Sequence, residues 1–263
     1  MKDVNGRVAI VTGAGRGIGQ TIARALGERG MRVVVNDISA AQAEGAAASL
    51  RDVGVEALAF PGDVSRKADA QALIERAEAE LGPLWLLVNN AGVFNSGPTA
   101  DLSEESWDAA FDVDAKGVFL CSQAAIRVMM PRHAGRIVNV ASIAGLIVRT
   151  QQIAYCAAKA AVIHFSRCLA VEMAPYGITV NCLCPGMTWT DMLETSARER
   201  GLDLDAMVQM IPAGRMAAEA DHAHLVSFLA SDEAGHITGQ VVAVDGAQSL
   251  YHPLMMGSRP ARP

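Results

Sequence analysis

The segment AYCAAKAAV, residues 154–162, places a phenol and an amine four residues apart. In a helix, residues i and i+4 lie on the same face, so Tyr155 and Lys159 would point the same way. A free phenol has a pKa of about 10, and a neighbouring cation favours its ionised form. Such a pair could exchange a proton with a bound oxygen. Alternatively, the two side chains cover a helix, with their stems packed and their polar ends in water.

A glycine-rich segment, TGAGRGIG at residues 12–19, follows an apolar run and opens a helical pattern. Gly13, Gly17 and Gly19 lack side chains, which lets the backbone turn tightly and approach a pyrophosphate. The helix that follows would present free N–H groups and the positive end of its dipole to the phosphates. The spacing is TGxxxGxG rather than GxGxxG, and a structural turn is the alternative for this loop taken alone.

Asp37 ends the second apolar run, 18 residues after Gly19. An acidic side chain at this point can accept hydrogen bonds from an adenosine ribose and would repel a 2′-phosphate. Arg16 acts in the opposite sense, because a guanidinium in the glycine-rich loop could pair with that phosphate. We predict NAD as the cofactor, with NADP as the alternative. Without a nucleotide, Asp37 would be a surface turn residue.

The elements that must position these groups form one repeated pattern. Short β-branched apolar runs alternate with stretches whose apolar residues recur every three or four positions. Apolar strands separated by helices are typical of a parallel sheet covered on both faces. The sequence therefore predicts an α/β fold, a single Rossmann-type doubly wound domain over residues 1–263 with a seven-stranded parallel sheet. The predicted strands are 7–11, 31–35, 56–60, 84–88, 136–140, 178–182 and 240–244.

Unusual residues follow six of these strands, at the edge where an open α/β sheet binds its ligands. We expect the six loops to converge on one cleft, which makes them a stronger signal together than any single motif. The loops contain residues 12–19, Asn36-Asp37, 62–64, NNAG at 89–92, Ala141-Ser142 and Pro185-Gly186.

The composition excludes several classes of function. The chain has 263 residues, 51% apolar and 19% charged, with a formal net charge of −6 and no basic cluster suited to nucleic acid. No signal peptide or apolar run of transmembrane length is evident, so we expect a soluble, cytoplasmic protein without membrane contact. We expect the five cysteines to be reduced thiols, and their spacing predicts no metal site.

Taken together, the motifs resemble the short-chain dehydrogenase/reductase family. The matching segments are TGAGRGIG (12–19), NNAG (89–92), Ser142, YCAAK (155–159) and PGMTWT (185–190), and the resemblance runs from about residue 6 to residue 246. It implies an NAD(P)-dependent oxidoreductase that transfers a hydride between a nicotinamide cofactor and a secondary alcohol or ketone. A diol, a polyol or another small hydroxy compound would be a suitable substrate.

The resemblance also implies a role for each catalytic residue. Tyr155 would be the general base for oxidation and the general acid for reduction. Lys159, aided by the oxidised nicotinamide ring, would lower the pKa of Tyr155, and it would also bind the nicotinamide ribose. Ser142 would hold the substrate oxygen and stabilise the charge that develops on it, although a helix N-cap is the alternative for this residue alone.

The family pattern implies a larger set of cofactor-binding residues and a quaternary structure. Family members usually form homotetramers through the helices that hold residues 104–131 and 153–175, plus a contact near the last strand. The apolar content of those helices is compatible with this, although the same residues could face the sheet. The implied cofactor-binding residues are Gly13, Arg16, Gly17, Ile18, Gly19, Asp37, Asp63, Val64, Asn90, Ala91, Gly92, Tyr155, Lys159, Pro185, Gly186, Thr188 and Thr190.

One position departs from the family pattern. In the segment FDVDAKGVF, residues 111–119, Asp114 stands where the family commonly has an asparagine that helps to position a water linking the lysine to solvent. An ionised carboxylate accepts hydrogen bonds but donates none, and near Lys159 it would favour the ammonium form. We expect an altered relay and an active enzyme, with a tolerated substitution as the alternative.

The substrate pocket is expected to be largely apolar, with a lid at about residues 190–212 and a C-terminal tail at 251–263. Besides Ser142 and Tyr155, we predict substrate contacts from Asn95, Gln152, Met187 and Trp189, where the two amides could bind a second oxygen. Further candidate wall residues are Phe94, Leu146, Val148, Met192, Met207 and Met210, whose methionines could equally be core residues.

Two other functions remain open. One is reduction of 3-oxoacyl groups on an acyl carrier protein: Arg127 fits a basic contact with such an acidic partner, whereas Val171 occupies another expected contact and is apolar. The other is a non-catalytic NAD-binding sensor or regulator, which only Asp114 favours. A panel of secondary alcohols, offered free and carrier-bound, would separate the three functions.

Overall fold

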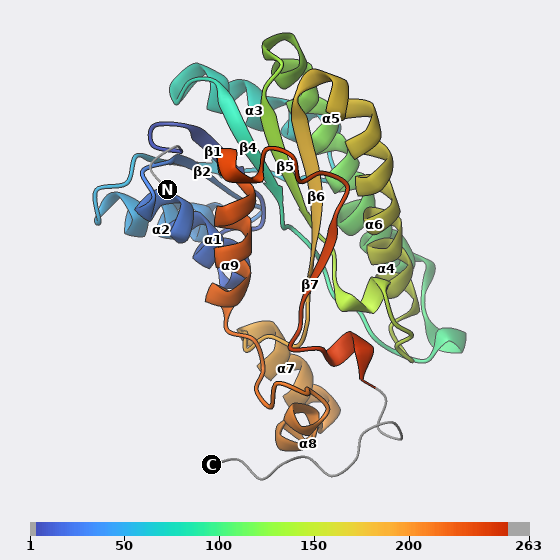
Figure 1. Ribbon diagram of the computed structural model, residues 1–263. Helices are drawn as coiled ribbons and strands as arrows, with labels where there is room; N and C mark the ends of the chain where they lie inside the picture. The colour runs from blue at the N-terminus through green and yellow to red at the C-terminus, as the bar shows by residue number, and fades with distance from the viewer. Residues whose placement is uncertain (1–3, 252–263) are drawn as a thin grey trace.

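The computed structural model describes residues 4–251, without the side chains of residues 191, 192, 196, 199 and 200. Except for Tyr251, the predicted tail at 251–263 lies outside the described residues. The architecture is a seven-stranded sheet between two layers of helices (Figure 1).

All neighbouring strands of the sheet are parallel, in the order β3-β2-β1-β4-β5-β6-β7. This order reverses between β1 and β4, as in a doubly wound fold, so the predicted fold class is confirmed. The sixth strand runs three residues beyond the predicted end, because Leu183, Cys184 and Pro185 remain buried and paired with β7. The strands are β1 (Val8–Val11), β2 (Arg32–Asp37), β3 (Ala57–Pro61), β4 (Leu84–Asn89), β5 (Gly135–Val140), β6 (Ile178–Pro185) and β7 (Val241–Val244).

The two faces of the sheet are covered by different helices (Figure 1). Side chains alternate along a strand, so Ala9 and Val11 of β1 enter one core while Val8 and Ile10 enter the other. The first core is closed by α1 (Gly17–Glu28), α2 (Ala40–Arg51) and α9 (Glu219–Leu229). The second is closed by α3 (Lys67–Glu80), α5 (Gly117–Met129) and α6 (Ile153–Met173).

Shorter elements connect the strands and helices at both edges of the sheet. A π-helical turn at Phe111–Lys116 joins α4 (Glu104–Ala110) to α5, and single-turn 3-10 helices lie at Thr99–Asp101, Met130–Arg132, Ile143–Gly145, Ala174–Tyr176, Asp232–Ala234 and Gln248–Leu250. Two helices, α7 (Asp191–Arg200) and α8 (Leu204–Gln209), occupy the segment predicted as a lid and lie beyond the ends of β6 and β7 (Figure 1).

By length and composition alone, the segment Ile153–Tyr176 is apolar enough to cross a membrane. In the fold most of this segment is α6, which packs along β6 and contributes Leu169, Ala170 and Met173 to a core. Burial against the sheet accounts for part of its apolar character, since 44% of its most apolar window is buried.

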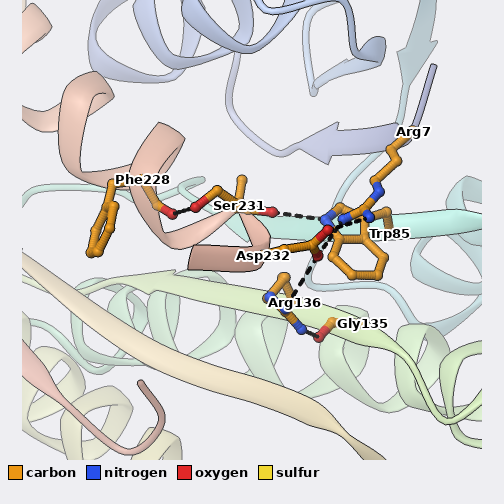
Figure 2. Close-up of polar contacts among 8 residues, drawn as sticks. Arg7, Trp85, Gly135, Arg136, Phe228, Ser231 and Asp232 are labelled. Carbon is orange, nitrogen blue, oxygen red and sulfur yellow. Dashed lines mark hydrogen bonds and ion pairs between the residues drawn. The ribbon is translucent and has the colours of Figure 1, made fainter. Parts of the chain in front are cut away.

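The opposite, amino edge of the sheet is closed by a polar cluster (Figure 2). Arg7 donates two hydrogen bonds of 2.8 Å to Asp232, and its guanidinium stacks 3.7 Å from the centre of the Trp85 ring. Arg136 lies 4.6 Å from the same ring and 3.8 Å from Asp232. The Trp85 indole N–H donates to the Ala230 carbonyl at 2.8 Å. The cluster therefore ties three adjacent strands to the end of α9.

Candidate active site

A cleft of about 550 Å³ opens at the carboxyl edge of the sheet. Residues from all six loops singled out in the sequence line it, together with α7, α8 and the start of α9. The parallel strands explain this convergence, because all of them end on the same side and the crossover at β1 and β4 leaves a crevice there.

The glycine-rich loop and the NNAG segment are built against each other. Gly13 has a φ of +59°, and a Cβ on it would lie 2.7 Å from the Cα of Ala91. The Asn90 amide donates to the carbonyls of Thr12 and Gly13 at 3.0 Å, and the Thr12 hydroxyl accepts from the N–H groups of Asn90 and Ala91. A side chain at position 13 would separate the two loops.

These loops leave a cradle that fits a dinucleotide. Helix α1 begins at Gly17 without a side-chain cap among the described residues, so its first N–H groups are available to a phosphate. Asp37, only 8% exposed, accepts from the N–H groups of Gly15 at 3.1 Å and Ser39 at 3.0 Å at the cleft wall. Every one of the seventeen residues expected to bind the cofactor lines this one cleft.

The candidate catalytic side chains lie across the cleft from the glycine-rich loop. Ser142 follows β5 and caps the turn at 143–145, accepting from the Ala144 N–H at 3.1 Å, as the alternative interpretation of this serine anticipated. Tyr155 and Lys159 come from the first turns of α6, and the Lys159 amine lies 5.6 Å from the centre of the phenol ring. The structure thus brings Ser142, Tyr155 and Lys159 together.

Asp114 lies behind this group and does not line the cleft. It is fully buried, accepts from the Val93 N–H at 2.8 Å through Oδ1, and holds that oxygen 3.9 Å from the Lys159 amine. The Lys159 amine also donates to the Val140 carbonyl at 3.3 Å. Gly92 makes room for this pair, because a Cβ there would lie 2.8 Å from the carboxylate and 3.2 Å from the amine.

The electrostatics around Tyr155 differ from the sequence-based expectation. Burial raises the pKa of Tyr155. The charge of Lys159 lowers this pKa, and the charge of Asp114 raises it further. A hydrogen bond with Ser142 also lowers the pKa, but the net direction is upward. The protein by itself therefore does not lower the phenol pKa, and the lowering expected with the oxidised nicotinamide bound stays a prediction. The i, i+4 spacing in the sequence predicts that a cation lies near the phenol. It does not predict that burial removes water from the hydroxyl, which raises the pKa.

The charges of Asp114 and Lys159 are coupled. Burial raises the pKa of Asp114, opposed by Lys159 and the Val93 N–H. Burial alone would lower the pKa of Lys159, but Asp114 and Tyr155 reverse this and raise it. The amine therefore stays charged beside the phenol, which is the state that a proton-transfer role requires.

The substrate half of the cleft agrees only partly with the predicted contacts. Gln152 and Met187 line it, as do the wall candidates Phe94 and Met207, and Phe94 packs edge-on against Tyr155 with ring centres 5.2 Å apart. The predicted substrate contacts from Asn95 and Trp189 are not found, because neither residue lines the cleft.

Both corrections have a local cause. The Asn95 amide donates to the Ser106 carbonyl and ties its loop to α4. The Trp189 side chain is exposed, and the Trp189 backbone N–H donates to the Ala217 carbonyl. Three wall candidates, Leu146, Val148 and Met210, are exposed outside the cleft. The side chain of Met192 lies outside the described residues.

Several lining residues were not anticipated from the sequence. Leu193 and Leu202 extend the apolar wall from the lid segment, and Glu219 accepts from the Thr21 hydroxyl at 2.5 Å near the glycine-rich loop. Arg149 is the most informative addition, because it brings a charge to the substrate half. Its place in the loop between Ser142 and Tyr155 was the signal that could have identified it.

Comparison with known proteins gives a consistent picture. A family model described as short chain dehydrogenase matches residues 7–201. The 2,3-dihydro-2,3-dihydroxybenzoate dehydrogenase of Bacillus subtilis is 39% identical over 95% of this chain and 98% of its own. A 3-oxoacyl-acyl-carrier-protein reductase of Synechocystis is 37% identical over 95% of this chain and all of its own.

A solved structure also superimposes closely. The crystal structure of a variant actinorhodin polyketide ketoreductase with NADPH has a TM-score of 0.90 and 35% sequence identity. The match covers 95% of this chain and 99% of that chain. The similarity therefore extends over nearly the whole fold.

Proposed function

Since this chain belongs to the short-chain dehydrogenase family and is a nicotinamide-dependent oxidoreductase acting on CH–OH groups, we propose that Ser142, Tyr155 and Lys159 carry out its chemistry. One observation supports this above all: the three side chains meet in the cleft that also contains the glycine-rich loop. A binding protein without catalysis would not need a buried, charged lysine beside a phenol, so the sensor alternative is set aside.

In the proposed mechanism, Tyr155 accepts the hydroxyl proton when an alcohol is oxidised and returns it when a ketone is reduced. Ser142 donates a hydrogen bond to the substrate oxygen and stabilises its developing charge. Lys159 keeps a positive charge near the phenol and offsets part of the penalty of burial. When bound, the nicotinamide supplies or accepts the hydride, and the glycine-rich loop and NNAG segment would hold the dinucleotide that carries it.

We propose NAD as the preferred form of the cofactor. Asp37 stands at the end of β2 with its carboxylate at the cleft wall, where it favours a free ribose hydroxyl over a 2′-phosphate. Arg16 lines the same end and is the feature that favours NADP. Side-by-side kinetics with the two cofactors decide between them.

A small secondary alcohol or its ketone is the proposed substrate, with residues 190–212 as its lid. The lid segment contributes Leu193, Leu202 and Met207 to the cleft. Reduction of a carrier-bound 3-oxoacyl group is the second candidate, favoured by the names of relatives such as the Synechocystis reductase and by the exposed Arg127 on α5. Against this candidate, Val171 on α6 is apolar and 76% exposed, so this position offers an acidic carrier no charge.

We also propose that the protein is a cytoplasmic homotetramer. Large apolar side chains are exposed on α4, α5 and α6: Trp107 at 37%, Phe119 at 43% and Val171 at 76%. An isolated surface would leave these groups in water, and association through these helices would cover them. Its five cysteines are free, which suits a reducing compartment. Light scattering of the purified chain measures the assembly.

The decisive experiment is a substrate-panel assay with NAD and NADP in parallel, followed at the absorbance of reduced nicotinamide. At least one secondary alcohol or ketone should be turned over. Tyr155→Phe should then lower kcat by about 10²- to 10⁴-fold, because it removes the group that transfers the proton. Binding of reduced cofactor to this variant should persist. Retained turnover in Tyr155→Phe would overturn the assignment.

A further inference from the structure

Among the residues that the structure describes, one positively charged side chain on the substrate side of the cleft, that of Arg149, has no carboxylate partner. Arg149 lines the cleft and is partly buried, and no carboxylate among the residues that the structure describes forms an ion pair with it. Burial lowers the pKa of the Arg149 guanidinium, because water is removed from this charge, and only the neighbouring Cys156 thiol acts in the opposite direction. A charge in such a place normally has a counter-ion or several hydrogen bonds.

The distribution of charge along the cleft strengthens this observation. The acidic lining residues, Asp37, Asp63 and Glu219, lie on the loops and helix of the nucleotide half, and Arg16 lies there too. The substrate half is lined by Phe94, Met187, Leu193, Leu202 and Met207, among other residues. Apart from Lys159, which is buried against Asp114, Arg149 is the one charged side chain described on that half.

The backbone of the Arg149 loop is held in place. The loop runs from the turn at Ile143–Gly145 to the start of α6, so it links Ser142 to Tyr155. The Gln151 residue has a φ of +61°, and its carbonyl accepts from the Gly97 N–H at 2.8 Å. The backbone that carries Arg149 is therefore anchored beside the catalytic side chains.

From these observations we propose that Arg149 is an anion-binding specificity residue, and that the natural substrate is a small hydroxy acid whose carboxylate pairs with its guanidinium. This inference rests on the proposed function of the same site. A planar guanidinium pairs with a carboxylate through two parallel hydrogen bonds, and the apolar walls strengthen that attraction by excluding water. The anchored carboxylate leaves the carbinol carbon facing Tyr155 and Ser142.

The test compares substrates that share one cyclohexanol ring and differ in whether they carry a negative charge. The probes are 3-hydroxycyclohexanecarboxylate, its methyl ester and its phosphate-bearing analogue, assayed with NAD and NADP. Wild-type enzyme should favour the carboxylate over the ester. In Arg149→Gln the KM for the carboxylate should rise between about ten- and a hundred-fold with kcat nearly unchanged, while the ester is unaffected. Arg149→Lys should recover part of the loss, because it restores charge but not the paired geometry.

Binding without turnover provides an independent readout. Calorimetry in the presence of cofactor should detect cyclohexanecarboxylate but not cyclohexanecarboxamide, and Arg149→Gln should abolish the difference. Arg24→Gln is the matched control, since it removes one arginine charge from an exposed pair with Glu28 on α1, away from the cleft. It should behave as wild type.

The outcomes of the two proposals can be told apart. Failure of every probe, charged or neutral, to change the reduced-nicotinamide absorbance counts against the proposed function. The anion site alone would be overturned if wild-type and Arg149→Gln enzymes turned over acid and ester equally and bound cyclohexanecarboxylate and cyclohexanecarboxamide equally. Stronger use of the phosphate-bearing analogue than of the carboxylate would overturn the choice of a carboxylate.

Discussion

At the scale of single residues, the unusual feature is a carboxylate at position 114. Asp114 keeps a structural task, because its Oδ1 accepts from the Val93 N–H beside the NNAG segment. Its other oxygen, Oδ2, is buried with no hydrogen-bond partner among the described residues. Its charge acts on both members of the catalytic pair, raising the pKa of Tyr155 and that of Lys159. A neutral side chain of the same shape would remove both effects.

The substitution Asp114→Asn should therefore move the pH–rate profile of alcohol oxidation to lower pH. Loss of the negative charge lowers the pKa of Tyr155, so the phenolate needed as base forms at lower pH and the acidic limb shifts down. It also lowers the pKa of Lys159, so the alkaline limb shifts in the same direction. The measurement is kcat/KM for one alcohol across the pH range.

The neighbouring Asp112 provides the control for this experiment. It lies on the same π-helical turn but is exposed and paired with Lys116 at 2.9 Å. Asp112→Asn should leave both limbs in place. A loss of kcat in Asp114→Asn without any displacement of the limbs would show that Asp114 acts only through packing, or is already uncharged.

At the scale of elements, the site depends on two helices that are anchored outside it. Helix α6 carries Tyr155 and Lys159 at its start and is fixed by packing along β6. Helix α9 starts at Glu219, a lining residue, where the Ala218 N–H donates to Asp221 at 2.8 Å. Its other end meets the polar cluster of Figure 2, where the Ala230 carbonyl accepts from the Trp85 indole N–H.

Removing the central carboxylate of that cluster should loosen the end of α9. Asp232→Asn should lower the free energy of unfolding by about 1 kcal/mol, since hydrogen bonds to charged groups are strong but Asp232 is half exposed and screened. The buried Arg136, only 7% exposed as a side chain, loses a counter-charge. Urea unfolding followed by circular dichroism measures the difference.

A surface pair gives the comparison for this prediction. Glu80→Gln breaks the i, i+4 pair with Arg76, in which both side chains are exposed, and should change the free energy of unfolding by about 0.5 kcal/mol or less. Equal effects of Asp232→Asn and Glu80→Gln would mean that the cluster adds nothing beyond an ordinary surface ion pair.

At the scale of the whole molecule, the fold was far more predictable than the details of the site. The short, uninterrupted apolar runs predict strands that are buried on both faces. The helices between these runs predict that neighbouring strands are parallel. The orientation of short polar side chains has no such rule: Asn95 turned to the Ser106 carbonyl instead of the substrate. Arg149 was missed because a lone arginine in a loop is usually a solvated one, and only the packed fold reveals its partial burial.

The stability of the whole molecule should also depend on one buried histidine, His222, in α9. It is fully buried, 2.7 Å from the Thr188 hydroxyl, and burial lowers its pKa to about 4. The unfolded chain binds this proton near pH 6.5, so stability is complete above that pH and is lost as the pH falls toward 4, by about 3 kcal/mol. In His222→Gln the decline over this window should become shallower by that amount, measured by urea unfolding at each pH. His224→Gln, exposed on the same helix, should retain the wild-type slope, and an unchanged slope in His222→Gln would contradict the assignment.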